Sequence, residues 1–241
     1  MINFKNKQHL LGLFRSAIDR YHMINEGDRI AVGVSGGKDS LALLCLLHEL
    51  QKFYPKKFSL TALTIDPLFG GEPADYSAVA SLCREMDMPY IISSKPLGKI
   101  LKEEARPCSL CAKLRRGILH NLTIEQGCSK LALGHHQDDA AETFLMNLLN
   151  GGRINCFSPI THMDRKNIYV IRPMIFASER EVASFAKNND LPVVKSTCPV
   201  DGSTERSRIK SLIAELSEEY EALPQKLVGA MQKDGVNGWK K

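Results

Sequence analysis

One short segment of the chain combines the residue types that bind phosphate groups. It reads SGGKDS and stands between an apolar stretch, residues 29–34, and a leucine-rich stretch, residues 41–50. Adjacent glycines let backbone amides approach an anion closely, and the N-terminus of a following helix attracts negative charge. The serines add hydroxyl groups and the lysine adds a positive charge. The segment therefore predicts a nucleotide phosphate site built from Ser35, Gly36, Gly37, Lys38, Asp39 and Ser40.

This segment differs from the Walker A loop at two positions. Walker A requires Ser or Thr after its Gly-Lys pair and a further glycine at a fixed spacing before it. Here Asp39 follows Lys38, and Val32 occupies the position of the first glycine. A carboxylate beside a phosphate is repulsive unless a Mg²⁺ ion bridges the two groups, so we expect magnesium at this site.

A second group of polar residues lies in GHHQDDAAETF, residues 134–144. Asp139 and Glu142 have the spacing of a capping box, so we expect Asp139 to be the N-cap of a helix. That role does not explain Asp138 or the two histidines. His136 is expected to be a packing or surface residue.

The cysteines form a third group. Cys108 and Cys111 stand in CSLC, where a helix N-terminus and nearby basic residues favour thiolates. Structural zinc, a redox dithiol and an iron–sulfur cluster are all compatible with such a pair, although zinc would need a second pair that the sequence does not show. Cys198 is the best candidate for a third cluster ligand. Cys45 and Cys83 fall in helical patterns and are expected in the core, while Cys128 and Cys156 remain open.

Alternating apolar and polar segments predict a fold in which parallel strands are covered by helices on both faces. The ligands of such sheets bind at the carboxyl ends of the strands. The phosphate loop, Asp66, the turn after His135 and Arg172 all fall at such ends. We expect five strands, at residues 29–34, 58–66, 89–94, 130–135 and 168–173, and helices at residues 7–23, 41–50, 75–88, 109–126, 139–149, 178–189 and 204–216.

Composition narrows the class of protein. Seven cysteines, an odd number, argue against a disulfide framework. No apolar run reaches the roughly 18 to 20 residues of a membrane helix, and no signal peptide is recognisable, so a cytoplasmic protein without membrane association is expected. A net charge of +5 permits a polyanionic partner without proving one.

SGGKDS resembles the PP-loop of the ATP-pyrophosphatases, which split ATP between its α and β phosphates. Together with CSLC, GHHQDD, VIRPM and a late cysteine, it resembles the tRNA 2-thiocytidine synthetase family over about residues 10–215. The resemblance implies a Rossmann-like adenine nucleotide alpha hydrolase fold. It also implies a helical segment at residues 1–28, a PP-loop domain with a cluster-binding insert at residues 29–200, and a helical tail at residues 201–241.

The same resemblance assigns roles to individual residues. Lys38, Asp39, Asp138 and Asp139 would be catalytic, with Asp138 or Asp139 helping to hold Mg²⁺, and Gly134 and His135 would line the reaction centre. Leu63, Ile65 and Asp66 would read the adenosine. Arg172 would steady the pyrophosphate or a substrate phosphate, unless it is a surface residue. Cys108, Cys111 and Cys198 would hold a [4Fe-4S] cluster with one iron open for sulfide, although the family usually has a second CxxC where this chain has only Cys198.

The implied function is ATP-dependent thiolation of a tRNA base, of the 2-thiocytidine type, through an adenylated base. Its partners would be tRNA and a sulfur donor, such as a cysteine desulfurase or free sulfide, and a homodimer is possible. Three alternatives remain: persulfide-based sulfur transfer without a cluster, a lysidine-type ATP-dependent ligase, and a nucleotide-binding regulatory module. The sequence does not identify the base or exclude a small-molecule acceptor.

Overall fold

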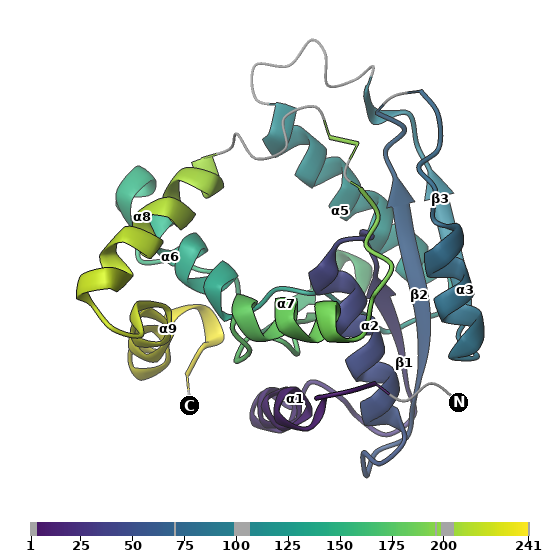
Figure 1. The fold of residues 1–241 in the computed structure, drawn as a ribbon, viewed down its shortest axis with the longest axis horizontal. Coiled ribbons are helices and arrows are strands. Elements are labelled where there is room, and N and C mark those ends of the chain that lie inside the picture. The colour runs from purple at the N-terminus through teal and green to yellow at the C-terminus, as the bar shows by residue number, and fades with distance from the viewer. Residues whose placement is uncertain (1–3, 70, 99–106, 196, 199–204, 241) are drawn as a thin grey trace.

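The computed structural model of the 241-residue chain describes residues 4–69, 71–98, 107–195, 197–198 and 205–240, with residues 107 and 108 described in their backbone alone. Its core is a six-stranded sheet in the order β3-β2-β1-β4-β6-β5, of which Figure 1 labels β1, β2 and β3. The strands are β1 (Asp28–Gly33), β2 (Phe58–Asp66), β3 (Tyr90–Ser94), β4 (Lys130–Ala132), β5 (Ile160–Met163) and β6 (Ile168–Ile171).

The predicted α/β fold class is confirmed, with one more strand than expected. The five predicted strands pair in parallel. The additional strand, β5, pairs antiparallel with β6 at the edge of the sheet. β5 has four residues and none of them is buried. It therefore lacks the continuous apolar run that marks the interior strands of a parallel sheet.

Helices cover both faces of the sheet, as predicted. They are α1 (Gln8–Arg20), α2 (Lys38–Gln51), α3 (Ser77–Glu85), α5 (Pro107–Glu125), α6 (Gln137–Gly151), α7 (Glu179–Asn188), α8 (Glu205–Glu219) and α9 (Leu223–Asp234). Successive side chains of a strand point to opposite faces. Val32 of β1 accordingly packs in the core with α1, α2, α3 and α7, whereas Ala31 packs with α5 on the other face.

The C-terminal helices pack on α6, away from the sheet (Figure 1). Ala141 of α6 forms a small apolar cluster with Ile209 and Ile213 of α8. Beyond α9, the fully buried Trp239 donates a hydrogen bond of 2.7 Å from Nε1 to the carbonyl oxygen of Phe157. The division at residues 28 and 200 remains a prediction. Within the described part of the chain, every helix is too short or too polar to cross a membrane.

Candidate active site

A pocket of about 400 Å³ opens at the carboxyl ends of β1, β2 and β4, between the sheet and α5. Eight of the residues singled out from the sequence line it: Ser35, Asp39, Ser40, Leu63, Ile65, Gly134, His135 and Asp139. The helix that carries the CxxC motif supplies the opposite wall, through Ala112, Arg115, Arg116, Leu119 and His120. The topology therefore gathers three sequence motifs around one space.

The PP-loop requires glycine at its second position. Gly36 has a φ of +85°, and a Cβ there would lie 2.8 Å from the Cβ of Val194. The N–H of Val194 also donates a hydrogen bond of 2.9 Å to the Gly36 carbonyl. The loop is thus packed closely against the segment that leads to Cys198.

Replacing Gly36 with alanine is expected to lower the free energy of unfolding by about 1–3 kcal/mol, because a positive φ strains an L-residue and Val194 leaves no room for a Cβ. Urea unfolding measures this effect. Gly12→Ala is the matched control, since a Cβ at that helical position meets nothing within 4 Å. Equal stability of the Gly36→Ala and wild-type proteins would contradict the described loop geometry.

Serine hydroxyls hold the loop in shape. Ser40 Oγ accepts a hydrogen bond from the Ser35 N–H at 3.1 Å and donates one to the Gly37 carbonyl at 2.9 Å. The N-cap of α2 is Gly37, which has no side chain to bond the amides of the first turn. These amides and the helix dipole can therefore serve an anion.

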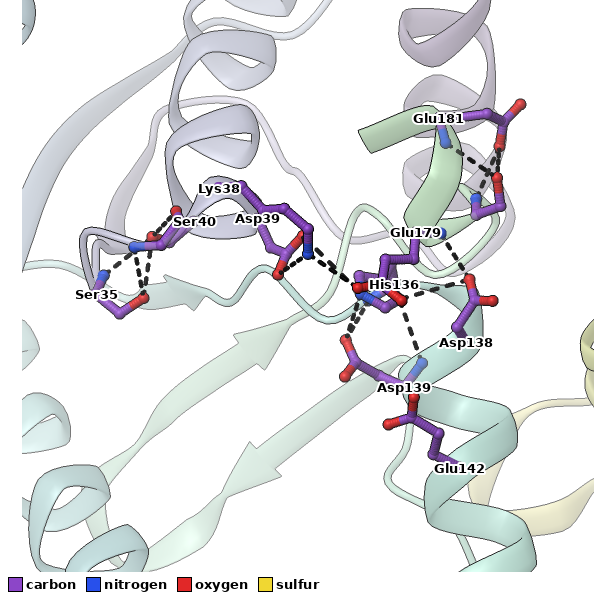
Figure 2. Close-up of polar contacts among 12 residues, drawn as sticks. Ser35, Lys38, Asp39, Ser40, His136, Asp138, Asp139, Glu142, Glu179 and Glu181 are labelled. Carbon is purple, nitrogen blue, oxygen red and sulfur yellow. Dashed lines mark hydrogen bonds and ion pairs between the residues drawn. The ribbon is translucent and has the colours of Figure 1, made fainter. Parts of the chain in front are cut away.

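Lys38 lies between two carboxylates. Its Nζ donates to Asp39 at 2.9 Å and to Glu179, at the start of α7, at 3.1 Å (Figure 2). Lys210 of α8 donates to the same Glu179 at 2.6 Å. Partial burial raises the pKa of Glu179, but the hydrogen bonds from Lys210 and Lys38 outweigh it and lower that pKa to about 2. Glu179 thus stays ionised and forms ion pairs with both lysines, which together keep a net positive charge.

The structure corrects the prediction for the start of α6. The N-cap is His136, whose Nδ1 accepts the Asp139 N–H at 3.3 Å, while Asp139 Oδ2 accepts the His136 N–H at 2.9 Å (Figure 2). Asp139 is therefore the third residue of the helix, because α6 begins two residues earlier than expected. His136 is buried, as a packing residue would be. Its ring nitrogens also lie within 3.9 Å of carboxylate oxygens of Asp39, Asp138 and Asp139.

Two elements distant in sequence complete this carboxylate cluster. Asp138 Oδ2 accepts the N–H of Glu179 at 2.6 Å, which fixes the N-terminus of α7 beside α6. Arg206 of α8 reaches Asp139 at 3.4 Å and Glu142 at 3.7 Å. Lys210 and Arg206 had no signal in the sequence, because charged residues on a helix surface are common and their partners are set by the fold.

Glu142 gives the cluster a pH dependence. Burial and the neighbouring Asp139 raise its pKa to about 7. Between pH 4.5, the ordinary pKa of a glutamate, and about pH 7, Glu142 keeps its proton in the folded state and has lost it in the unfolded state. The stability of the folded state relative to the unfolded state therefore falls as pH rises through this range.

We therefore expect Glu142→Gln to gain stability relative to wild type from pH 5 to pH 8, by about 2 kcal/mol, because glutamine keeps the neutral form. Thermal or urea unfolding across this range provides the measurement. Glu215→Gln, on an exposed part of α8, is the control and should show a flat difference. A flat difference for Glu142→Gln as well would contradict the raised pKa.

The expected adenosine residues separate into two groups. Leu63 and Ile65 line the pocket. Asp66 instead holds the loop after β2, since its carboxylate accepts N–H groups of Leu68 at 3.1 Å and Ala74 at 2.9 Å. Gly134 also lines the pocket, and a Cβ there would lie 3.1 Å from the backbone of Asp39.

Arg172 is buried rather than exposed, so the surface interpretation is wrong. Its Nη1 donates to the Ser158 carbonyl at 2.6 Å, and its guanidinium lies 4.9 Å from the centre of the Phe157 ring. The same ring also contacts His135, at 4.9 Å between ring centres. Burial, followed by the charge of Arg172, lowers the pKa of His135 to about 3, so His135 is a neutral residue of the pocket. A role of Arg172 toward phosphate stays a prediction.

A second pocket, of about 280 Å³, adjoins the first and contains Cys198. Ser35 and Arg115 line both pockets. Cys111 precedes Arg115 by four residues on α5, so the two lie on the same face of that helix. The side chain of Cys108 lies outside the described residues.

Accessibility separates the cysteines whose side chains are described. Cys111 and Cys198 are partly exposed, whereas Cys45, Cys83, Cys128 and Cys156 are buried. Burial raises the pKa of Cys83 to about 11 and that of Cys156 to about 12, which disfavours the thiolate that a metal requires. Cys45 and Cys83 are in the core, as predicted.

The motifs and their arrangement agree with comparisons to known proteins. A family profile for the PP-loop domain matches residues 7–216. The tRNA-cytidine(32) 2-sulfurtransferase of Geobacter sulfurreducens is 39% identical over 236 residues, which covers 95% of this chain and 90% of the relative. This chain belongs to the PP-loop family of tRNA sulfurtransferases. The same enzyme of Geobacter metallireducens is 41% identical over 226 residues, covering 91% of this chain and 87% of the relative.

A solved structure of this family supports the same assignment. The U34-tRNA thiolase NcsA from Methanococcus maripaludis, described with its [4Fe-4S] cluster, superposes with a TM-score of 0.75 at 28% identity. The match covers 92% of this chain and 77% of NcsA. The predicted family and the predicted enzyme class, ATP-dependent sulfurtransferase, are confirmed by these matches.

Proposed function

We propose that the protein converts a cytidine of tRNA into 2-thiocytidine. It would use ATP to activate the base and a cluster held by Cys108, Cys111 and Cys198 to deliver sulfur. The observation that carries this proposal is the shared wall of the two pockets: Ser35 and Arg115 lie between the PP-loop pocket and the pocket of Cys198. Activation and sulfur delivery need such adjoining sites, because the activated base must meet the sulfur before water does. The related sulfurtransferases, at about 40% identity, support cytidine as the acceptor.

The first pocket suits ATP. Its volume of about 400 Å³ falls in the range of small-molecule sites. Ser35 and Ser40 line it, and Lys38 with the first amides of α2 stands between these two serines in the chain. Its walls include the apolar side chains of Leu63 and Ile65. We assign the phosphates to the rim and the adenosine to the walls.

Carboxylates at the rim suit magnesium. Asp39 and Asp139 both line the pocket, and each has a carboxylate oxygen within 3.9 Å of His136 Nε2. Mg²⁺ is usually held by one or two carboxylates together with substrate phosphates. His136 would then act as a positioning residue that keeps the two carboxylates together, and Asp138 would keep α7 and Glu179 in place.

The cysteine positions suit a cluster. Cys111 and Cys198 are the partly exposed thiols among the described side chains, and Arg115 lies four residues after Cys111 on α5 and lines the pocket of Cys198. When bound, a cluster with three cysteine ligands supplies the sulfur that replaces the base oxygen. Donor proteins such as a cysteine desulfurase, or free sulfide, would replenish that sulfur. A homodimer remains part of the proposal.

In the activation step, the O2 atom of cytidine bonds to the α-phosphorus as the bond to the β-phosphate oxygen breaks and pyrophosphate leaves. The chain positions the two reactants and neutralises charge, which is what phosphoryl and adenylyl transfer chiefly require. Lys38 and the magnesium at Asp39 and Asp139 would stabilise the charge on the phosphates. The oxygen later departs with AMP when sulfur takes its place.

Nucleoside analysis tests the proposal. The anaerobically purified protein is incubated with ATP, Mg²⁺, sulfide and tRNA lacking thiolated cytidine, and the digested tRNA is examined by mass spectrometry. We expect 2-thiocytidine, with AMP and pyrophosphate formed in equal amounts. Thiolation by an iron-free protein only when a cysteine desulfurase and free cysteine replace sulfide as the sulfur source would favour persulfide transfer. In a parallel incubation with added lysine, attachment of lysine to the base would favour a lysidine-type ligase, and absence of pyrophosphate in every incubation would favour a regulatory module.

A further inference from the structure

His120 lies on the pocket-facing side of α5 and lines the PP-loop pocket. It is only 4% exposed, and its Nε2 has no hydrogen-bond partner among the described residues. A buried polar atom left without a partner costs about 1–3 kcal/mol, so proteins rarely keep one without a reason. A ligand that bonds this nitrogen would remove the cost.

The position of His120 shows which part of a ligand it can meet. α5 follows β3 and leads into the parallel strand β4, so it runs opposite to the strands and its N-terminus lies at their carboxyl ends. His120 stands twelve residues after Cys108, about 18 Å further along the helix axis. It lines the pocket together with Leu131, the middle residue of β4. His120 therefore belongs to the floor of the pocket and the PP-loop to its rim.

The part of ATP farthest from its phosphates is the adenine. With the phosphates at Ser35 and Ser40, adenine is the group that reaches the floor. The acceptor base has a different constraint, because it is attached to a polynucleotide and must attack the α-phosphorus near the rim. The walls beside His120 are apolar, through Leu119, Leu131 and Leu133, as is usual around a flat ring.

We propose that His120 is a specificity-determining residue that recognises the adenine of ATP through a hydrogen bond at its Nε2. The inference rests on the proposed ATP-dependent function and adds a side chain of α5 to the adenosine site expected from Leu63 and Ile65. A neutral imidazole can donate or accept at this nitrogen, according to its tautomer, so it can complement the amino group or a ring nitrogen of adenine. Burial, followed by the charges of Lys166 and Arg116, lowers the pKa of His120, which keeps the ring neutral.

Calorimetric titration of the holoprotein with ATP and with inorganic tripolyphosphate tests this role. His120→Phe keeps a ring of similar size without nitrogens, so it should weaken ATP binding about tenfold and leave tripolyphosphate binding unchanged. His120→Gln places an amide near the position of Nε2 and should bind ATP within about threefold of wild type. Wild-type ATP affinity in His120→Phe would overturn the proposal.

Other outcomes identify the competing roles. A raised KM for tRNA with unchanged ATP affinity would assign His120 to the acceptor base, and equal loss of ATP and tripolyphosphate binding would make it a structural residue. Both results overturn the proposal. If His120→Phe does not fold, ¹⁵N-histidine NMR of the wild type replaces it. The Nε2 resonance of His120 is identified as the one that is missing from the spectrum of His120→Gln. In the wild type it should shift when ATP is added and not when tripolyphosphate is added, and an unshifted resonance would overturn the proposal.

ATP affinity is measured without RNA. A protein that binds ATP through His120 but does not thiolate tRNA would overturn the proposed function and leave this inference standing.

Discussion

The Lys38→Ala protein is expected to form AMP and pyrophosphate about 10²- to 10³-fold more slowly than wild type, the usual effect of removing one electrostatic contact to a transition state. Two losses combine. The phosphates lose a cation, and Asp39 loses the ammonium that lies 2.9 Å from its carboxylate, so its charge repels them. Iron content should stay at the wild-type level, because Lys38 lies on α2 and the cysteines proposed to hold the cluster lie on α5 and in the segment before α8.

Pyrophosphate release and iron content are measured on the same preparations. Lys52→Ala is the matched control: this lysine lies at the opposite end of α2 and pairs with Glu49. It should leave both quantities unchanged. If Lys38→Ala also lost its iron, or kept normal pyrophosphate release, the assignment of Lys38 to the phosphates would be wrong.

The Cys198→Ala protein is expected to show the opposite pattern. Wild type purified without oxygen should carry about four irons per chain and a broad visible absorption. The variant should lose most of both, because two cysteines cannot hold the cluster that three hold. Its ATP affinity should stay close to wild type, since the ATP pocket is lined by other residues.

Cys128→Ala is the control for this second experiment. Cys128 is buried against Ala31 and Leu131 on the α5 face of the sheet and lines neither of the two pockets described above. It should therefore keep its iron. If Cys198→Ala kept its iron and Cys128→Ala lost it, the assignment of Cys198 as the third cluster ligand would be wrong. A colourless wild type would leave persulfide transfer as the better mechanism.

Local patterns were sufficient for the scaffold. β2 was predicted at its observed bounds, and the other parallel strands within a few residues, because each is an apolar run between turn residues. SGGKDS was predicted as the turn before a helix at residues 41–50, but only its first three residues form the turn, because α2 begins at Lys38. The positive φ of Gly36 and the side-chain-free N-cap Gly37 are the parts that neighbouring residues determine. The strand β5 was missed because it is short and partly exposed and is held only by its pairing with β6.

The sequence by itself determined the family, the α/β sheet and eight of the residues that line the pocket proposed for ATP, because these follow from motifs and strand ends that are recognisable from neighbouring residues. Only the tertiary structure decided that Glu179 pairs with both the PP-loop lysine and Lys210, that His136 lies beside three carboxylates, and that Arg115 lines both pockets. Lys38 and Glu179 are 141 residues apart. A single charged or imidazole side chain carries no local sign of its partner, so such contacts are fixed by the path of the chain through space.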